Sequence, residues 1–269
     1  MQWWCSAQGV AWTWAWRPYA GVWVLVLLLA AAYVWQVRRT PGVDPASPRA
    51  AVFGAGVLCL WAALDWPLGA LAAGYLASVH MAQFLLVGAI APPLLLLGIP
   101  RAAYERLHAR PRALWILRAV THPLAALAIF NGIIAFTHWP AVVDALMPTQ
   151  LGSFAIDMLW ILGGIVFWWP VVAPVPVRPR FTYPLKMGYL ILNTVASTAP
   201  FVYLTFSSLP VYTTYEMAPP IEGITKREDQ QLAGILMKAG GGTVLWTAIS
   251  ALFFRWYREE EGPLASPLL

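Results

Sequence analysis

His80 is the one histidine and Gln83 the one amide in the long apolar stretch Leu68–Gly98. They lie three residues apart, so on a helix both side chains project from one face. A polar pair at membrane depth is costly unless it faces protein, water or a ligand. Imidazole binds copper, iron and zinc in proteins. This face therefore predicts either a ligand site or a buried hydrogen-bonding pair, enclosed in both cases by other helices.

Other polar and thioether side chains are predicted in the same half of the membrane as His80. By helical rise, Asp157 lies ~10 Å into its helix, Met237 and Lys238 lie at a similar depth, and His138 ends a further helix. Thioether sulfur favours Cu(I), and imidazole also suits copper. We therefore take His80, His138, Met237 and Asp157 as candidate metal ligands, with copper as the candidate ion and no bound metal as the alternative.

Each candidate ligand also has a structural interpretation. His138 and Met237 can cap a helix or pack at the interface without binding anything. Asp157 and Lys238 carry opposite charges at matching depth, which predicts a structural ion pair that would repel a metal ion. The sequence contains no Ser-His-Asp arrangement, P-loop or dinucleotide fingerprint. We therefore expect no enzyme activity.

The composition is that of an integral membrane protein. The chain has 269 residues, of which 60% are hydrophobic and 11% charged, and its mean hydropathy is +0.64. A soluble domain is about half apolar and a quarter charged. The net charge of +5 does not indicate nucleic acid binding, because basic residues of membrane proteins collect in cytoplasmic loops. Cys5 and Cys59 form no motif, which excludes a redox dithiol or a thiolate metal site.

Hydrophobic runs predict an all-α, polytopic fold with a single seven-helix membrane domain over residues 1–269. Residues 1–19 are a Trp-rich interfacial segment, and residues 256–269 are a charged, frayed cytoplasmic tail. The basic segment after the third span predicts one short interfacial helix, and Pro210–Asp229 predicts a polar loop. The predicted spans are Ala20–Val37, Ala50–Trp66, Leu68–Leu97, Val120–Thr137, Leu151–Val172, Pro184–Leu209 and Gln231–Phe254, with a tight return at Pro67 between the second and third.

The distribution of basic residues predicts how the chain is oriented. Cytoplasmic loops carry an excess of Lys and Arg. With seven spans, every Lys and Arg except Arg17, Lys226, Arg227 and Lys238 falls on one side of the membrane, together with the C-terminus. We therefore expect the N-terminus outside and the C-terminus inside.

Several motifs occur in an order that resembles the CtaG family of membrane proteins linked to cytochrome c oxidase assembly. They extend over most of the chain, from about Trp14 to Arg255. The motifs are His80-Met81-Ala82-Gln83, Ala91-Pro92-Pro93-Leu94-Leu95-Leu96-Leu97-Gly98, His122-Pro123, Thr137-His138-Trp139-Pro140, Phe167-Trp168-Trp169-Pro170 and Asp229-Gln230-Gln231-Leu232-Ala233-Gly234.

The resemblance implies a non-catalytic, seven-helix protein of the bacterial inner membrane that helps to deliver or insert copper during oxidase maturation. Its partners would be haem–copper oxidase subunits and the lipid bilayer, not nucleic acid. An accessory subunit that stays bound to an oxidase and carries no metal is the alternative. A small-molecule or copper permease is a third interpretation, but the sequence shows no inverted repeat or paired broken helices.

This sequence departs from the family pattern around the candidate ligands. The family usually has a second histidine after the glutamine of the third helix, where this chain has Phe84. It often has two histidines near a glutamate at the start of the fifth helix, where this chain has Ser153, Ile156 and Asp157. An aromatic residue commonly follows the position of Met237, where this chain has Lys238. We therefore expect a weakened or altered metal site.

Overall fold

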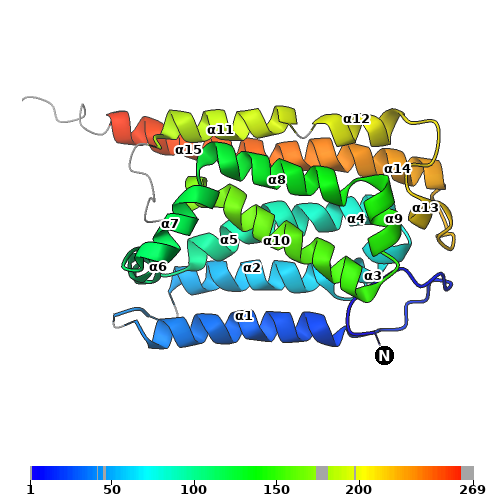
Figure 1. Ribbon diagram of the computed structural model, residues 1–269, viewed down its shortest axis with the longest axis horizontal. Helices are drawn as coiled ribbons and strands as arrows, with labels where there is room; N and C mark the ends of the chain where they lie inside the picture. The colour runs from blue at the N-terminus through cyan, green and yellow to red at the C-terminus, as the bar shows by residue number, and fades with distance from the viewer. Residues whose placement is uncertain (1, 41, 45–46, 174–180, 197, 262–269) are drawn as a thin grey trace, which may run out of the picture.

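Long helices running side by side make up one bundle (Figure 1). The computed structural model describes residues 2–40, 42–44, 47–173, 181–196 and 198–261, and within these ranges the chain is helical and has no strand. The predicted all-α fold is confirmed. The α-helices are α1 Ala20–Arg38, α2 Pro48–Leu64, α3 Leu68–Gly74, α4 Ala77–Phe84, α5 Ala91–Gly98, α6 Arg101–His108, α7 Pro111–Val120, α8 Pro123–Thr137, α9 Pro140–Leu146, α10 Gln150–Val172, α11 Tyr183–Ala196, α12 Thr198–Phe206, α13 Thr213–Glu216, α14 Lys226–Ile235 and α15 Gly241–Glu261; π-helical turns η1 Leu85–Ile90 and η2 Leu236–Gly240 join α4 to α5 and α14 to α15.

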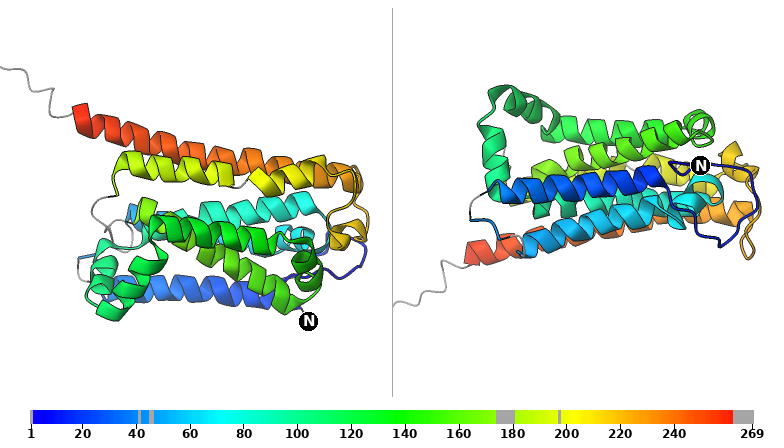
Figure 2. Two further views of the ribbon diagram at one scale, coloured as in Figure 1. Left: turned by 45° about the horizontal axis from the view of Figure 1, so that its top comes forward. Right: turned by 90° about the horizontal axis from the view of Figure 1, so that it is seen from below.

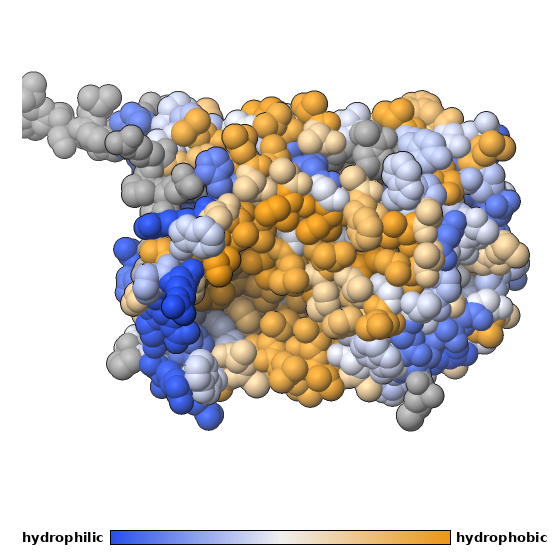
Figure 3. Space-filling view, in the orientation of Figure 1, coloured by the Kyte–Doolittle hydropathy of each residue, from blue (hydrophilic) through white to orange (hydrophobic). Residues whose placement is uncertain are grey.

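The described part of the chain has five to seven candidate membrane spans. Two bent pairs, α2 with α3 and α7 with α8, account for the range, because each pair is long enough only if it is counted as one span. The molecular surface in Figure 3 is apolar along the middle of the bundle and hydrophilic at both ends, as expected for a membrane protein. The other candidate spans are Ala20–Arg38, Ala77–Gly98, Gln150–Val172, Tyr183–Phe206 and Lys226–Glu260.

The turn between the second and third spans lies further along the chain than the sequence predicts. The chain does not turn back at Pro67, because α3 continues α2 after a bend of 47°. It turns at Tyr75 and Leu76, where the backbone leaves the helical conformation. The return helix α4–η1–α5 then packs along α2. The N-terminal segment packs closely against this turn. A Cβ at Gly74 would lie only 2.7 Å from the Cα of Ala7, so the close approach requires glycine.

Basic helices α6 and α7 lie at the end of the bundle where α1 and α15 also finish (Figure 1). The sequence predicts one interfacial helix here, but Pro111 starts a second one. Helix α7 meets α8 at an angle of 66°. Arg106 donates a hydrogen bond of 3.0 Å to the carbonyl of Arg39, which links α6 to the end of α1. The arginines of α6 and α7 therefore lie at the end of the bundle where α1 also finishes.

The last predicted loop and tail contain more helix than expected. Short helix α13 lies within the predicted loop Pro210–Asp229, and α14 begins at Lys226. Thr225 and Glu228 form a capping box, each bonding the other's backbone N–H, which fixes this start. Residues 256–261 of the predicted frayed tail continue α15, whereas residues 262–269 lie outside the described ranges.

The Trp-rich N-terminal segment packs into the bundle end opposite the basic helices (Figure 1). Trp4 and Cys5 are buried, although Trp14 is exposed as expected of an interfacial residue. The backbone N–H groups of Trp3 and Trp4 donate to the side-chain oxygen of Gln150 at the start of α10, at 2.7 and 3.3 Å. Burial raises the pKa of the Cys5 thiol, which keeps it protonated. This segment is therefore part of the folded core.

Candidate functional site

His80 and His138 lie beside each other in the bundle interior. His80 is on α4 and fully buried, and His138 directly follows α8 and is 6% exposed. Their ring centroids are 6.2 Å apart. The structure thus brings together the two histidines that the sequence predicts as ligands.

Three aromatic side chains, one of them on α4 itself, surround the histidine pair. Trp160 of α10 lies 5.0 Å from the ring of His80 and 6.0 Å from that of His138. Phe84 lies 5.1 Å from His138, and Tyr215 lies 5.7 Å from His80. We call these five side chains the imidazole cage. All five are buried, so the cage is a dry, aromatic enclosure around two polar rings.

Three of the four imidazole nitrogens in the cage make no hydrogen bond of ordinary geometry with a described residue, and the carbonyl of Ala72, which lies near His80, already accepts from Tyr215. The three nitrogens are Nδ1 and Nε2 of His80 and Nε2 of His138, and all are buried. The fourth, Nδ1 of His138, lies 2.9 Å from the carbonyl oxygen of Ile134. A carbonyl can only accept, so this Nδ1 carries the hydrogen and Nε2 of the neutral ring holds a free lone pair. Metal-binding histidines are oriented by the same kind of backbone hydrogen bond.

The aromatic residues are held from outside the cage. The indole N–H of Trp160 donates to the hydroxyl of Thr137 at 3.0 Å, and the hydroxyl of Tyr215 donates to the carbonyl of Ala72 at 2.7 Å. Tyr212 donates to the carbonyl of His138 at 3.0 Å. Burial raises the pKa of both tyrosine hydroxyls, so they stay protonated donors. None of these polar groups therefore donates a hydrogen bond to the unpartnered imidazole nitrogens.

Asp229 of α14 fixes the start of the helix that carries His80. Its carboxylate accepts hydrogen bonds from the backbone N–H groups of Ala77 and Ser78, at 2.7 and 3.0 Å, and from the Ser78 hydroxyl. The residue preceding α4 is Leu76, whose side chain cannot cap a helix. Asp229 supplies this cap from a distant part of the chain. The sequence places it only at the outer start of the last helix, within a motif of the family resemblance.

Gln230 attaches the segment that carries Tyr212 and Tyr215. Its side-chain oxygen accepts from the backbone N–H of Val211 at 2.7 Å, and its amide N–H donates to the carbonyls of Leu204 and Leu209. Asp229 and Gln230 are adjacent on α14. Asp229 therefore positions the helix of His80, and Gln230 positions the segment that carries Tyr215. Neither role could be read from local sequence, because both depend on contacts between distant segments.

The predicted ion pair between Asp157 and Lys238 is not formed. Asp157 accepts a hydrogen bond of 2.7 Å from the indole of Trp4. Lys238 donates to the carbonyl of Thr194 at 2.8 Å and to the hydroxyl of Thr198 at 2.7 Å. Segment boundaries predict depth along a helix but not the direction a side chain faces around it. Here the two residues face different neighbours, the N-terminal segment and the α11–α12 helices.

The other two candidate ligands are not part of the cage. Asp157 is one turn before Trp160 on α10, with its carboxylate bonded to Trp4. Met237 is buried on η2, which packs against α4. The described residues contain no group of three His, Cys, Asp or Glu side chains able to hold a metal. Any ion in the cage would thus have two protein nitrogens as its principal ligands.

A cavity of about 260 Å³ lies at the same end of the bundle as the N-terminus. Asp229, Gln230, Glu216 and Tyr215 are among its lining residues. Tyr215 also lies 5.7 Å from the ring of His80. This tyrosine therefore borders both the polar cavity and the imidazole cage.

The model of the cytochrome c oxidase caa3 assembly factor family, Caa3_CtaG, matches residues 28–259. The chain belongs to this family. No significant match to the chain was found among curated proteins or among solved structures. As an assembly factor of this family, the protein works in a membrane and interacts with oxidase components.

One departure from the family resemblance lies in the cage itself, and two others lie on the helix that carries Trp160. Phe84, which stands where the resemblance places a second histidine, packs its ring against both His138 and Trp160. Ser153 and Asp157, which stand at two further such positions, are buried on the face of α10 that leads to Trp160. In this assembly factor the cage thus keeps one pair of imidazoles and is closed by aromatic rings.

Proposed function

We propose that this assembly factor holds one Cu(I) ion between His80 and His138 as it supplies copper to an oxidase. The observation that carries the proposal is the set of unpartnered, buried imidazole nitrogens. An unsatisfied buried polar group costs about 1–3 kcal/mol, so three of them in one cage call for a ligand. A separation of 6.2 Å between the rings suits a shared ion, because metal–imidazole bonds are about 2 Å long.

The chemistry of the cage favours a soft ion of low charge. Zinc sites use at least three protein ligands, which the described residues do not provide here. The cage has no carboxylate to balance a dication, and an unbalanced charge in a dry site is expensive. Imidazole is a good ligand for copper, and a monovalent ion carries the smallest desolvation cost. Cu(I) therefore fits the two neutral rings best.

In the proposed topology, access to the cage is from the extracytoplasmic side of the membrane. We infer seven spans, with the N-terminus outside and the C-terminus inside the bacterial inner membrane. The gathering of basic residues at the end where α15 finishes supports this orientation. Copper would then reach the cage through the cavity beside Asp229 and Glu216, once Tyr215 moves aside. The cavity is polar and carries both signs of charge, because Lys226 and Arg227 line it together with Glu216 and Asp229.

Copper binding can be measured directly on the purified protein. We expect close to one equivalent of Cu(I) under reducing conditions, in competition with a chromophoric Cu(I) chelator. His80→Ala and His138→Ala should each lower the affinity at least tenfold. His122→Ala is the matched control, because His122 precedes α8 at its other end and is not part of the cage. Equal copper affinity in wild type and both cage variants would refute the proposal.

The role as a non-catalytic, transient factor is tested by purification. We expect oxidase subunits to copurify in less than stoichiometric amounts. A metal-free accessory subunit would instead copurify one to one with the oxidase, whatever the copper content of the growth medium. That result, together with an empty cage, would replace this proposal by the accessory-subunit interpretation.

A further inference from the structure

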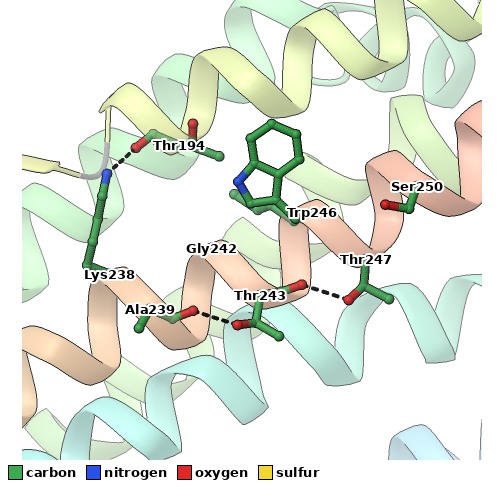
Figure 4. A pocket seen from close by; sticks show the side chains of 9 residues that line it. Thr194, Lys238, Ala239, Gly242, Thr243, Trp246, Thr247 and Ser250 are labelled. Carbon is green, nitrogen blue, oxygen red and sulfur yellow. Dashed lines mark hydrogen bonds between the residues drawn. The ribbon is translucent and has the colours of Figure 1, made fainter.

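Helices α11 and α15 border an open groove with a volume of about 720 Å³ (Figure 4). The two helices lie side by side along one side of the bundle (Figures 1 and 2). The side chains that line the groove are mostly small or hydroxyl-bearing, one is cationic, and two, Leu245 and Trp246, are large and apolar. The small, hydroxyl-bearing and cationic residues include Thr194, Lys238, Gly242, Thr243, Thr247 and Ser250.

Lys238 lies in the middle of a membrane-spanning helix. It is the only charged residue between Gln230 and Phe254. At 1.5 Å per residue it is ~17 Å from Arg227 and ~26 Å from Arg255, the nearest basic residues along its helix. A lipid phosphate lies at the membrane surface, so the headgroup region is far from this amine. The amine is therefore at the depth of the hydrocarbon core.

The positive charge of Lys238 is not balanced within the described protein. Its amine donates only to neutral oxygens, those of Thr194 and Thr198. The one ion pair among the described residues joins Arg101 and Glu105 at the surface of α6. A charged residue at membrane depth is costly unless it is paired. An anion bound in the groove would therefore lower the free-energy cost of placing this half-buried amine at membrane depth.

The floor of the groove permits a close approach by another helix. Thr243 and Thr247 turn their hydroxyl hydrogens back to carbonyls of their own helix, at 2.8 Å each. Figure 4 shows these two bonds; because a hydroxyl oxygen can accept while its hydrogen is donated, both oxygens can still accept a hydrogen bond. Small residues at this spacing are typical of helix–helix contacts in membranes. The groove therefore offers both packing and polar contacts to a helix.

We propose that the groove receives one transmembrane helix of another polypeptide, which carries a carboxylate at the depth of Lys238. Charge complementarity identifies the partner, because a carboxylate carried on a spanning helix lies at this depth, whereas a lipid phosphate lies at the membrane surface. The site is separate from the imidazole cage, since Lys238 bonds to α11 and α12 while the adjacent Met237 is buried against the bundle. The docking surface thus does not depend on copper binding.

Two synthetic transmembrane peptides test this proposal. They are identical apolar helices, one with Glu and one with Gln at the central position, labelled for energy transfer to the C-terminus of the full-length protein in phosphatidylcholine vesicles. We expect the Glu peptide to associate roughly 3- to 18-fold more tightly, the range of interhelical polar contacts in membranes. Lys238→Met should abolish this preference, and Lys238→Arg should keep it.

A second variant covers the case in which Lys238→Met fails to fold. Thr247→Leu fills the groove without touching the amine and should weaken binding of both peptides. Leu162→Ala, an exposed position on α10 outside the groove, is the control and should leave both affinities unchanged. Equal binding of the Glu and Gln peptides would overturn the proposal, as would loss of binding in vesicles that contain phosphatidylglycerol, which would identify an anionic lipid as the occupant.

Discussion

Asp229 caps the helix of His80 through hydrogen bonds of 2.7 and 3.0 Å to the backbone N–H groups of Ala77 and Ser78. A carboxylate is well suited to this position, because the N-terminus of a helix carries partial positive charge. His80 lies one turn further along the same helix. The last span therefore determines where the first imidazole of the cage is placed, although it contributes none of the cage rings.

Removing the Asp229 cap should loosen α4 and displace His80. For Asp229→Ala we expect a loss of unfolding free energy of about 1–3 kcal/mol, because buried N–H groups lose a charged acceptor. The Cu(I) affinity should fall together with the stability. Thermal unfolding in detergent and chelator competition measure the two effects. Glu222→Ala, an exposed position in the preceding loop, is the control. Unchanged stability in Asp229→Ala would show that Leu76 and its neighbours suffice to begin the helix.

Trp4 should be coupled energetically to Asp157. Trp4→Phe removes the indole donor and leaves a buried carboxylate without that partner, which should cost about 1–3 kcal/mol. A double-mutant cycle with Asp157→Leu measures the coupling directly. Trp14→Phe should have no effect, because Trp14 is 71% exposed.

The same cycle between Asp157→Leu and Lys238→Met should give additive effects, since these residues have different partners. A coupling energy above about 0.5 kcal/mol would indicate that the two charges interact after all.

Membrane topology can be tested with reporters at two positions. A reporter fused after Leu269 should behave as cytoplasmic, and one inserted in the loop between α13 and α14 as extracytoplasmic. The reason is the gathering of basic residues in the loops at the end where α15 finishes. Insertion at Gly223 suits the second reporter, because this glycine has a positive φ of 90° and open space around it. The opposite signal at either position would contradict the orientation.

Hydropathy predicts the all-helical fold and the approximate position of the long apolar helices, because an apolar run long enough to cross a membrane has few alternatives; the described residues contain five to seven candidate spans. It does not predict where α2 ends, since Pro67 was compatible with both a turn and a bend. The turn after Gly74 depends on the close approach of Ala7, a contact with a distant segment. The burial of Trp4 was missed for a related reason, because clustered Trp residues are equally typical of a membrane interface.

The candidate site was predictable in part. His80 and His138 stand out in the sequence as imidazoles near apolar helices, and the structure places them side by side. Their aromatic neighbours are indistinguishable in the sequence from lipid-facing aromatic residues. The error over Asp157 and Lys238 has a simple geometric origin, since equal depth is only one of the two coordinates that decide whether side chains on different helices meet.

Phe84 is the position at which the metal site should be easiest to strengthen. Phe84 lies one turn after His80 and its ring packs against His138, so an imidazole there would face the same space. Phe84→His should raise the Cu(I) affinity, because a third nitrogen ligand would join the two already present. Chelator competition measures the affinity, and X-ray absorption of the copper-loaded protein measures the number of nitrogen ligands. Phe136→His on the exposed face of α8 is the control for adding a histidine elsewhere. A gain in both variants would indicate adventitious binding, and no gain in Phe84→His would show that copper is not held in the cage.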